Sequence, residues 1–431
     1  MTQVRYSAYL RMWLLTALLV IGAITTINLV VDPYGVYGLI RIEGFNSVKV
    51  RAQQRGWLSK SHNLARVGPR SLILGNSRAE VGFDPSHPGW PADGRPAYNY
   101  ALPGVGLSAS LDQLDYALRT APIRTVVLGL DFRDFTFDAS RVKPQTRKEP
   151  VHNADDGQPR EWVRRMGDLA DTLLSLGALG DSMRTVLGQR NRFATRITEL
   201  GFNPLLDYIP IAREIGYRAI FDQKNSEYAR AFTREGKDVF VPGSQESPEF
   251  DTLRAFLARC RKAGVRLHIV VYPYHAHIQE LFRSAGLWNS FEDWKRKVTQ
   301  IVNDDAAAAG PASQFPLWDF SGYSPFATEE VAAPGDLRSE MRWYWEGGHF
   351  KKELGDLALD KVLGHGDPRR VVEGEFGTLL TAANLEAHLA SIRAQRERYA
   401  TSHQKDLAYL ARLVEAAKRP TIKQSDSAEP Q

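Results

Sequence analysis

Leu72-Ile73-Leu74-Gly75-Asn76-Ser77-Arg78 is the stretch of sequence that decides the fold. Three consecutive aliphatic residues stop at a glycine and a serine follows, which is typical of a buried strand ending at the carboxyl edge of a parallel sheet. Open α/β sheets keep their chemistry at that edge. We therefore expect Ser77 to be a nucleophile; the alternative is that its hydroxyl only caps a helix.

A second segment, Tyr344-Trp345-Glu346-Gly347-Gly348-His349-Phe350, lies near the end of the chain and carries a carboxylate three residues before a histidine. A serine hydroxyl becomes a good nucleophile when a base takes its proton, and the base needs an acceptor that holds its tautomer. Ser77, His349 and Glu346 supply these three roles, so we expect a Ser-His-Glu triad. The alternative is that His349 is an ordinary surface residue.

These segments resemble the SGNH (GDSL-type) hydrolase superfamily, whose serine follows the first strand and whose Asp-x-x-His pair lies in the last sequence block. The resemblance covers roughly residues 68–365 without a middle insertion, and it implies a flavodoxin-like fold. The membrane-anchored layout also resembles the D-alanyl transfer protein of teichoic acid synthesis and the alginate O-acetylation proteins. Two positions depart from the pattern: Glu346 replaces Asp, and Gly129-Leu130-Asp131 stands where the family has Gly-x-Asn.

The resemblance also implies an oxyanion hole, whose donors each lower the barrier by about 3–4 kcal/mol. Ser77 N–H is the first expected donor and Gly104 N–H the second. The third position holds Asp131, which has no donor unless it is protonated, and Asn99 is a possible replacement. The alternatives for Asp131 are a turn cap or an ion pair with Arg133 or Arg78.

Three further residues are candidates for substrate contact. Arg78 follows the serine directly, His275 follows an expected strand, and Trp345 precedes the carboxylate. Trp345 can stack on a sugar ring or simply pack in the core. His275 and His277 lack an apparent third metal ligand, so we expect neither a metal nor another cofactor.

Composition limits the classes of function. The net charge of +5 is small, and no Lys/Arg run is interleaved with aromatic residues, so we expect no nucleic-acid partner. The single cysteine, Cys260, excludes an internal disulfide. It shares a helical face with Leu253, Phe256 and Leu257, which predicts that it packs in the core.

The residues between Arg11 and Asp32 carry no charge and are long enough to span a bilayer. A cleavable signal peptide is the alternative, but its apolar core would be long and no Ala-x-Ala-like site follows. We expect one uncleaved anchor in the cytoplasmic membrane. The soluble part then faces the periplasm or the exterior, because Arg5 and Arg11 favour a cytoplasmic N-terminus.

The remaining chain reads as alternating strands and helices, which predicts an α/β fold with a parallel sheet and helices on both faces. Strands are expected at 70–75, 97–101, 125–130, 266–272 and 315–319. Leucines around 169–176 predict helical structure, and two amphipathic helices are expected near the C-terminus. The expected organisation is a cytoplasmic flank (1–12), an anchor (13–31), a linker (32–66), a first domain half (67–135), a helical insertion that forms either a lid or a surface decoration (136–245), a second domain half (246–365), C-terminal helices (366–419) and a disordered tail (420–431).

Two functional classes remain open. The first is a serine esterase or O-acyltransferase acting on a cell-surface polysaccharide or an acylated glycan, with a membrane acyl-donor protein as a further expected partner. The second is a non-catalytic, membrane-tethered assembly protein for polysaccharide export that retains the SGNH fold. An intact Ser77 and His349 favour the first class, whereas Asp131 favours the second.

Overall fold

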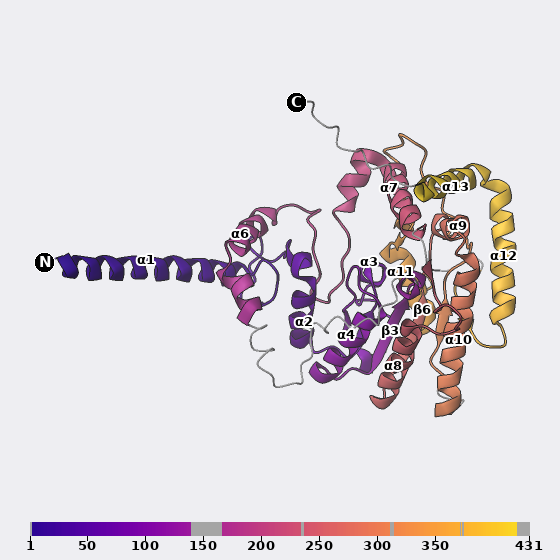
Figure 1. Cartoon of the computed structure of the whole chain (residues 1–431), viewed down its shortest axis with the longest axis horizontal. Helices are drawn as coiled ribbons and strands as arrows, with labels where there is room; N and C mark the ends of the chain where they lie inside the picture. Colours follow the sequence, from indigo (N-terminus) through magenta and orange to yellow (C-terminus); the bar gives the residue numbers. More distant parts are fainter. Residues whose placement is uncertain are drawn as a thin grey trace, which may run out of the picture. The chain divides into compact units, whose positions relative to one another are not determined.

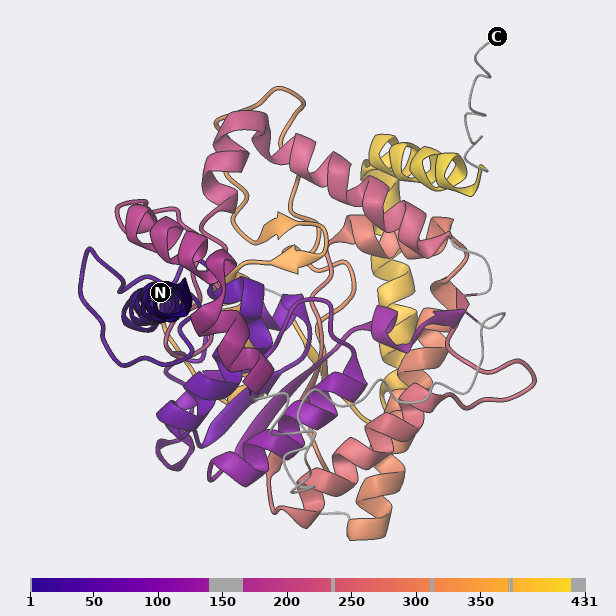
Figure 2. The same cartoon turned by 60° about the vertical axis from the view of Figure 1, so that its left-hand side comes forward.

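The computed structural model describes residues 2–138, 166–233, 237–310, 314–370, 372 and 375–419. The expected polar loop at 139–160 and the expected tail at 420–431 lie outside the described residues. Figures 1 and 2 show the chain in two views. The chain divides into two compact units: unit 1 comprises residues 1–127 and 147–211, and unit 2 comprises residues 128–146 and 212–431.

Six strands form one sheet, in the order β10-β7-β6-β3-β1-β2. Their bounds are β1 Ser71–Leu74, β2 Ala97–Asn99, β3 Thr125–Leu130, β6 Arg266–Val271, β7 Leu317–Asp319 and β10 Thr378–Leu380. β1 pairs with β2 and β6 with β7 in parallel, whereas β10 pairs antiparallel with β7. The predicted α/β class is therefore confirmed, with a mostly parallel sheet surrounded by helices. β10 was missed, because the sequence at 366–419 predicts helices only.

Unit 1 begins with α1 (Thr2–Val31), whose segment Tyr6–Val31 is long and apolar enough to cross a membrane. Its last turn belongs to the fold, because Asn28 is fully buried. The Asn28 amide donates to Leu173 O at 2.9 Å, and Ser182 Oγ donates to Asn28 Oδ1 at 2.9 Å. Figure 1 shows α1 with α6 (Leu176–Gly188) beside its C-terminal end. The π-helical turn Ala170–Leu174 also contacts α1.

Residues 32–66, the expected linker, contain regular structure. The 3₁₀ turn η1 (Ala52–Arg55) and α2 (Gly56–Val67) form its second part, and Leu64 is fully buried. Asp32 begins the segment with φ +48° and accepts hydrogen bonds from Val36 N and Gly38 N at 2.8 Å each. These bonds close a loop directly after α1.

Among its described residues, unit 1 has three further elements, and the first of them carries the candidates Ser77 and Arg78. They are α3 (Ser77–Gly82), η2 (Ala92–Gly94) and α4 (Leu107–Thr120). The described residues of the expected insertion at 136–245 divide between the two units. Helical structure is expected around residues 169–176, and the π-helical turn Ala170–Leu174 and α6 are found there; Leu169, Leu174 and Leu176 are exposed.

Unit 2 contains most of the helices. They are α8 (Pro248–Lys262), α9 (Ala276–Ser284), α10 (Trp288–Ala309), α11 (Lys352–Leu363), α12 (Leu385–Ser402) and α13 (Gln404–Lys418), with most of α7 (Tyr208–Phe232). Cys260 is fully buried on α8, as predicted. The two predicted C-terminal helices correspond to α12 and α13. The guanidinium of Arg396 on α12 binds the buried Glu280 carboxylate at 3.1 and 3.2 Å.

Unit 2 also contains five short elements, three of which lie at Asp131, Glu346 and His349 in the chain. The 3₁₀ turn η3 (Phe132–Phe135) leads into β4 (Phe137–Asp138), which pairs antiparallel with β5 (Lys237–Asp238). β8 (Tyr344–Glu346) and β9 (His349–Phe350) form a separate antiparallel pair, seen as the two short orange arrows in Figure 2.

Candidate functional site

Ser77 is the first residue of α3 and follows directly from β1. All four residues of β1 are buried, and Gly75 turns the chain out of the sheet with φ +140°, a backbone conformation that favours glycine. Asn76 caps the helix, because its side-chain oxygen accepts a hydrogen bond from Arg78 N at 3.0 Å. The capping role proposed as an alternative for Ser77 therefore belongs to Asn76, and Ser77 is half-buried at the start of the helix.

A buried ion pair supports α3. Lys60 on α2 lies 3.0 Å from Glu80 on α3, and both side chains are almost completely excluded from solvent. Lys60 Nζ also donates to Ala101 O at 2.5 Å. Burial lowers the pKa of Lys60, and the Glu80 carboxylate opposes that decrease. A buried pair of this kind is costly to break, since either partner alone would be an uncompensated charge. It joins α2, α3 and the loop after β2.

Asn99, the expected replacement donor of the oxyanion hole, is hydrogen-bonded to the backbone around α3. It is fully buried, and its amide nitrogen donates to Ala79 O and Phe83 O at 2.8 Å each. Its side-chain oxygen accepts from Ala101 N at 3.1 Å. Both amide hydrogens are therefore committed to the backbone around α3, and the role of Asn99 is to position that helix.

Gly104 and Arg78 are the other unit 1 candidates. Gly104 is exposed, has φ +73°, and has no atom within 4 Å of the position that a Cβ would occupy. Gly104 therefore lies in an uncrowded part of the loop after β2. Arg78 is 3% exposed, so it belongs to the base of α3 and presents little surface to a substrate.

Glu346 and His349 are in contact in unit 2. The His349 Nδ1–H donates to Glu346 Oε1, and Gly348 N donates to Glu346 Oε2 at 2.7 Å. Glu346 is fully buried, whereas His349 is 22% exposed. Donation from Nδ1 fixes the tautomer and leaves the lone pair on Nε2, as a general base requires. His349 is therefore oriented by a carboxylate and is more than a surface residue.

A tight hairpin makes this contact. Glu346 at the end of β8 is the register partner of His349 at the start of β9, with only Gly347 and Gly348 between them. A Cβ on Gly348 would lie 2.0 Å from Tyr228 Oη, so the backbone passes too close to this ring for any side chain. Residues that flank a two-residue loop face each other across the hairpin. The spacing Glu-x-x-His therefore reflects hairpin geometry.

Asp131 is a buried cap. Its Oδ1 accepts from Arg133 N at 3.1 Å and from Tyr274 Oη at 3.0 Å, while Phe132 N donates to the same Tyr274 oxygen at 3.0 Å. Asp131 is 1% exposed and forms the N-cap of η3. The turn-capping alternative is therefore observed, and it accounts for a carboxylate at this position without an oxyanion role.

His275 and Trp345, the other two expected substrate contacts, are buried. The His275 ring caps α9 by accepting from His277 N at 3.2 Å, and its Nε2–H donates to Glu329 O at 2.9 Å. Burial lowers the pKa of His275 to about 4. Trp345 is 8% exposed and has Lys351 Nζ 4.4 Å from its ring centroid. His275 packs edge-on against Tyr344 of β8, with the ring centroids 5.0 Å apart.

The candidate residues thus divide between the units. Ser77, Arg78, Asn99 and Gly104 belong to unit 1, whereas Asp131, His275, Trp345, Glu346 and His349 belong to unit 2. Within the described ranges, no group of three His, Cys, Asp or Glu side chains is placed to hold a metal ion. No protein-family model matches the chain, and no curated protein is similar to it in sequence.

Proposed function

We propose that this chain is a membrane-anchored serine esterase or O-acyltransferase whose triad is Ser77, His349 and Glu346. The single observation that carries the proposal is the contact between the buried Glu346 carboxylate and His349 Nδ1, which leaves Nε2 as the basic nitrogen. A buried carboxylate that orients a partly exposed histidine is the arrangement that activates a serine hydroxyl.

The chemistry follows from these three groups. His349 Nε2 takes the proton of Ser77 Oγ as that oxygen attacks the acyl carbonyl, and Glu346 stabilises the resulting imidazolium. Collapse of the tetrahedral intermediate breaks the ester bond, and His349 gives its proton to the leaving alkoxide. Water or a sugar hydroxyl then attacks the acyl-serine, so hydrolysis and transfer differ only in the acceptor. The N–H groups of Ser77 and Gly104 are the proposed oxyanion donors.

The strand order supports the finer assignment of a flavodoxin-like, SGNH-type fold. The parallel strands of the sheet run β2-β1-β3-β6-β7, which is the order 2-1-3-4-5 when they are counted along the chain. In this order the ligand site lies at the carboxyl ends of the strands, where the chain direction across the sheet reverses beside the first strand. Ser77 follows the first strand directly.

The resemblance and the anchor together indicate the substrate. We propose a cell-surface polysaccharide or an acylated glycan as the acceptor or ester substrate, on the periplasmic or exterior side of the cytoplasmic membrane, with a membrane protein as acyl donor in the transfer reaction. Trp345 adds no support for sugar stacking, since it is buried.

A non-catalytic assembly protein is the second candidate, and two observations favour it. Asp131 caps η3, and the Asn99 amide is fully engaged by backbone carbonyls. The oxyanion hole proposed here therefore has two backbone donors and no side-chain amide.

Labelling with a fluorophosphonate probe separates the two candidates, because only an activated serine reacts. The full chain in detergent should be labelled, and Ser77→Ala and His349→Ala should not. Ser86→Ala is the matched control, since Ser86 is an exposed serine of the same unit and its loss should leave labelling unchanged. An unlabelled parent protein would establish the non-catalytic candidate.

A further inference from the structure

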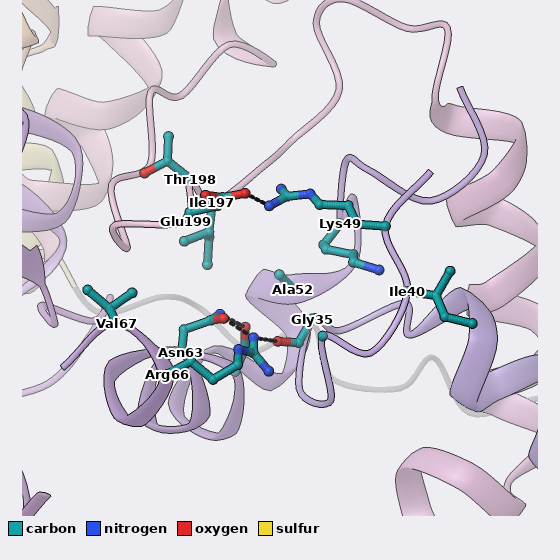
Figure 3. A pocket seen from close by; sticks show the side chains of 13 residues that line it. Gly35, Ile40, Lys49, Ala52, Asn63, Arg66, Val67, Ile197, Thr198 and Glu199 are labelled. Atoms are coloured by element: carbon teal, nitrogen blue, oxygen red, sulfur yellow. Dashed lines mark hydrogen bonds and ion pairs between the residues drawn. The ribbon is translucent and has the colours of Figure 1, made fainter. Parts of the chain in front are cut away.

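A cavity of about 240 Å³ lies in unit 1, beside the loop that follows α1 (Figure 3). Its wall carries three cations, Arg41, Lys49 and Arg66, and one carboxylate, Glu199. A cavity of this size has room for several water molecules. That volume suits a small anionic group.

The cations of this cavity are incompletely neutralised. Arg66 donates to Val36 O at 2.7 Å and to Gly35 O at 3.0 Å, and Lys49 Nζ donates to Val31 O at 2.8 Å. These acceptors are uncharged carbonyls. Among the residues that the structure describes, no carboxylate lies within ion-pair distance of Lys49 or Arg66.

Arg41 has the one carboxylate partner in the wall. It pairs with Glu199, and both side chains are exposed, so this pair contributes little to stability. The pair instead places a negative group at the edge of a positive cavity. An incoming anion would compete with Glu199 for the Arg41 guanidinium.

The backbone is shaped around these cations. Gly38 has φ +61°, and a Cβ there would lie 2.7 Å from Arg66 Cζ. Gly35 has φ +69°, and its Cβ would lie 3.2 Å from Lys49 Cγ. Figure 3 shows the Lys49 and Arg66 side chains around Gly35. Burial lowers the pKa of Lys49 to about 8; Asp32 opposes the decrease, and Arg41 and Arg66 add to it. A bound anion would relieve this unfavourable environment.

The position of the cavity ties it to the membrane surface. Lys49 donates to the carbonyl of Val31, the last residue of α1, and Asn28 marks the point where α1 enters unit 1. Leu39 and Ile42, on the loop that contributes Arg41, are 67% and 52% exposed. Apolar side chains beside a membrane span favour burial at the boundary between head groups and acyl chains.

We propose that this cavity binds the phosphate of an anionic membrane lipid, with Arg41, Lys49 and Arg66 as the ligands of the phosphate oxygens. The apolar residues of the same loop would contact the acyl chains of that lipid. Exposed Leu176, Met183 and Leu187 on α6, which packs against α1, extend the apolar surface of unit 1. The site is independent of the acyl chemistry proposed for Ser77.

The test uses the full chain in a non-ionic detergent and measures its melting temperature against three probes. These are dihexanoylphosphatidylglycerol, which is anionic; dihexanoylphosphatidylcholine, which has the same chains but a compensating cation; and inorganic phosphate. A ligand that binds only the folded protein raises the melting temperature with concentration, which gives its dissociation constant. We expect the anionic lipid to bind at least about tenfold more tightly than either of the other probes.

Three variants test whether the anionic lipid binds in the cavity. Arg41→Gln should weaken binding of the anionic lipid about tenfold, since a charge-assisted contact is lost. Glu199→Gln should strengthen it, because the competing carboxylate is gone. Arg55→Gln is the matched control: Arg55 is an exposed arginine of unit 1 that pairs with Asp171 outside the cavity, so binding should be unchanged.

Three outcomes would contradict binding of a lipid phosphate in this cavity. Equal stabilisation by the two lipids would show that the chains alone bind, and equal affinity for inorganic phosphate would make this a site for free phosphate. Equal effects of Arg41→Gln and Arg55→Gln would remove the cavity from the interaction. Any of these results would overturn the proposal, and none bears on labelling of Ser77.

Discussion

Glu346 lies opposite His349 across a two-residue loop of glycines, and the Gly348 N–H donates to the Glu346 carboxylate. The contact is encoded by seven consecutive residues, so it forms wherever this hairpin forms. Glu346 is buried and His349 is 22% exposed. Because Nδ1 of His349 contacts the carboxylate, Nε2 is the basic nitrogen and lies on the other side of the ring. Glu346 and His349 are two of the three residues of the proposed triad.

Glu346→Gln should lower kcat for a short acyl ester such as p-nitrophenyl acetate by about 10³- to 10⁴-fold, because an amide no longer holds the required tautomer. His349→Ala should be at least as damaging. The measurement is steady-state hydrolysis by the full chain, with the melting temperature as a check on folding. An active Glu346→Gln protein would show that the pair is structural.

Ser77→Ala should abolish the same hydrolysis while the melting temperature changes little, since a single hydroxyl is removed from a half-buried position. The double variant Ser77→Ala/His349→Ala should be no slower than Ser77→Ala alone, because residues that act as a unit have non-additive effects. Additive losses in the double variant would contradict a shared mechanism.

Gly348→Ala should lower both activity and stability, by about 1–3 kcal/mol in the free energy of unfolding, because its Cβ would meet Tyr228 Oη at 2.0 Å. Gly347→Ala is the matched control. Its Cβ would approach Ile278 only to 3.3 Å, so its effect should be smaller. Denaturant unfolding measures both, and equal effects of the two substitutions would argue against a tight fit of the hairpin.

Asp131→Asn should leave the melting temperature nearly unchanged, because an amide oxygen can accept the bonds from Arg133 N and Tyr274 Oη. Asp131→Ala should destabilise the protein by about 1–2 kcal/mol, as expected for a lost cap. Neither substitution should raise esterase activity. A rise for Asp131→Asn would return this residue to the oxyanion hole.

Acidification below pH 6.5 should destabilise unit 2 through its half-buried His268 and its buried His275 and His277. Burial lowers the pKa of His268 and of His275 to about 4, and that of His277 well below its ordinary value of 6.5. Between pH 6.5 and about 4 the unfolded chain therefore binds protons that the folded chain does not. Their contribution to stability is complete above pH 6.5 and is lost as the pH falls.

His268→Asn tests this directly. It removes one of these groups, so the dependence of the unfolding free energy on pH should flatten by up to about 1.4 kcal/mol per pH unit between pH 6.5 and 4. Chemical denaturation at several pH values measures the slope. Identical slopes for the variant and the parent would show that His268 titrates alike in both states.

Elements with a strong local signal could be predicted from the sequence. The strands at 125–130 and 266–272 are continuous β-rich apolar runs, and they form β3 and β6. The hairpin also had a local signal, because two apolar runs separated by Gly-Gly are typical of a two-residue turn.

Contacts between distant segments could not be predicted in this way. The bond from Tyr274 to Asp131 spans 143 positions, and the Asn99 amide is occupied by carbonyls that only the folding of α3 brings near. Residues 32–66 have a mixed composition with no clear period, and their order comes from buried contacts such as Lys60 with Glu80. Asp131 and Asn99 are candidates in the sequence, and in the structure they make capping and buried hydrogen bonds that the sequence does not reveal.

The last turn of α1 is built into unit 1 through Asn28, and Ser77 belongs to the same unit. A flexible linker over residues 32–66 would have let the soluble part wander roughly 30 Å from its anchor. The folded segment removes that slack, so Ser77 lies at a fixed distance from the last turn of α1. In the membrane-anchored enzyme proposed above, that distance sets how far from the bilayer the serine works, and lengthening the connection after Val31 would change which molecules it meets.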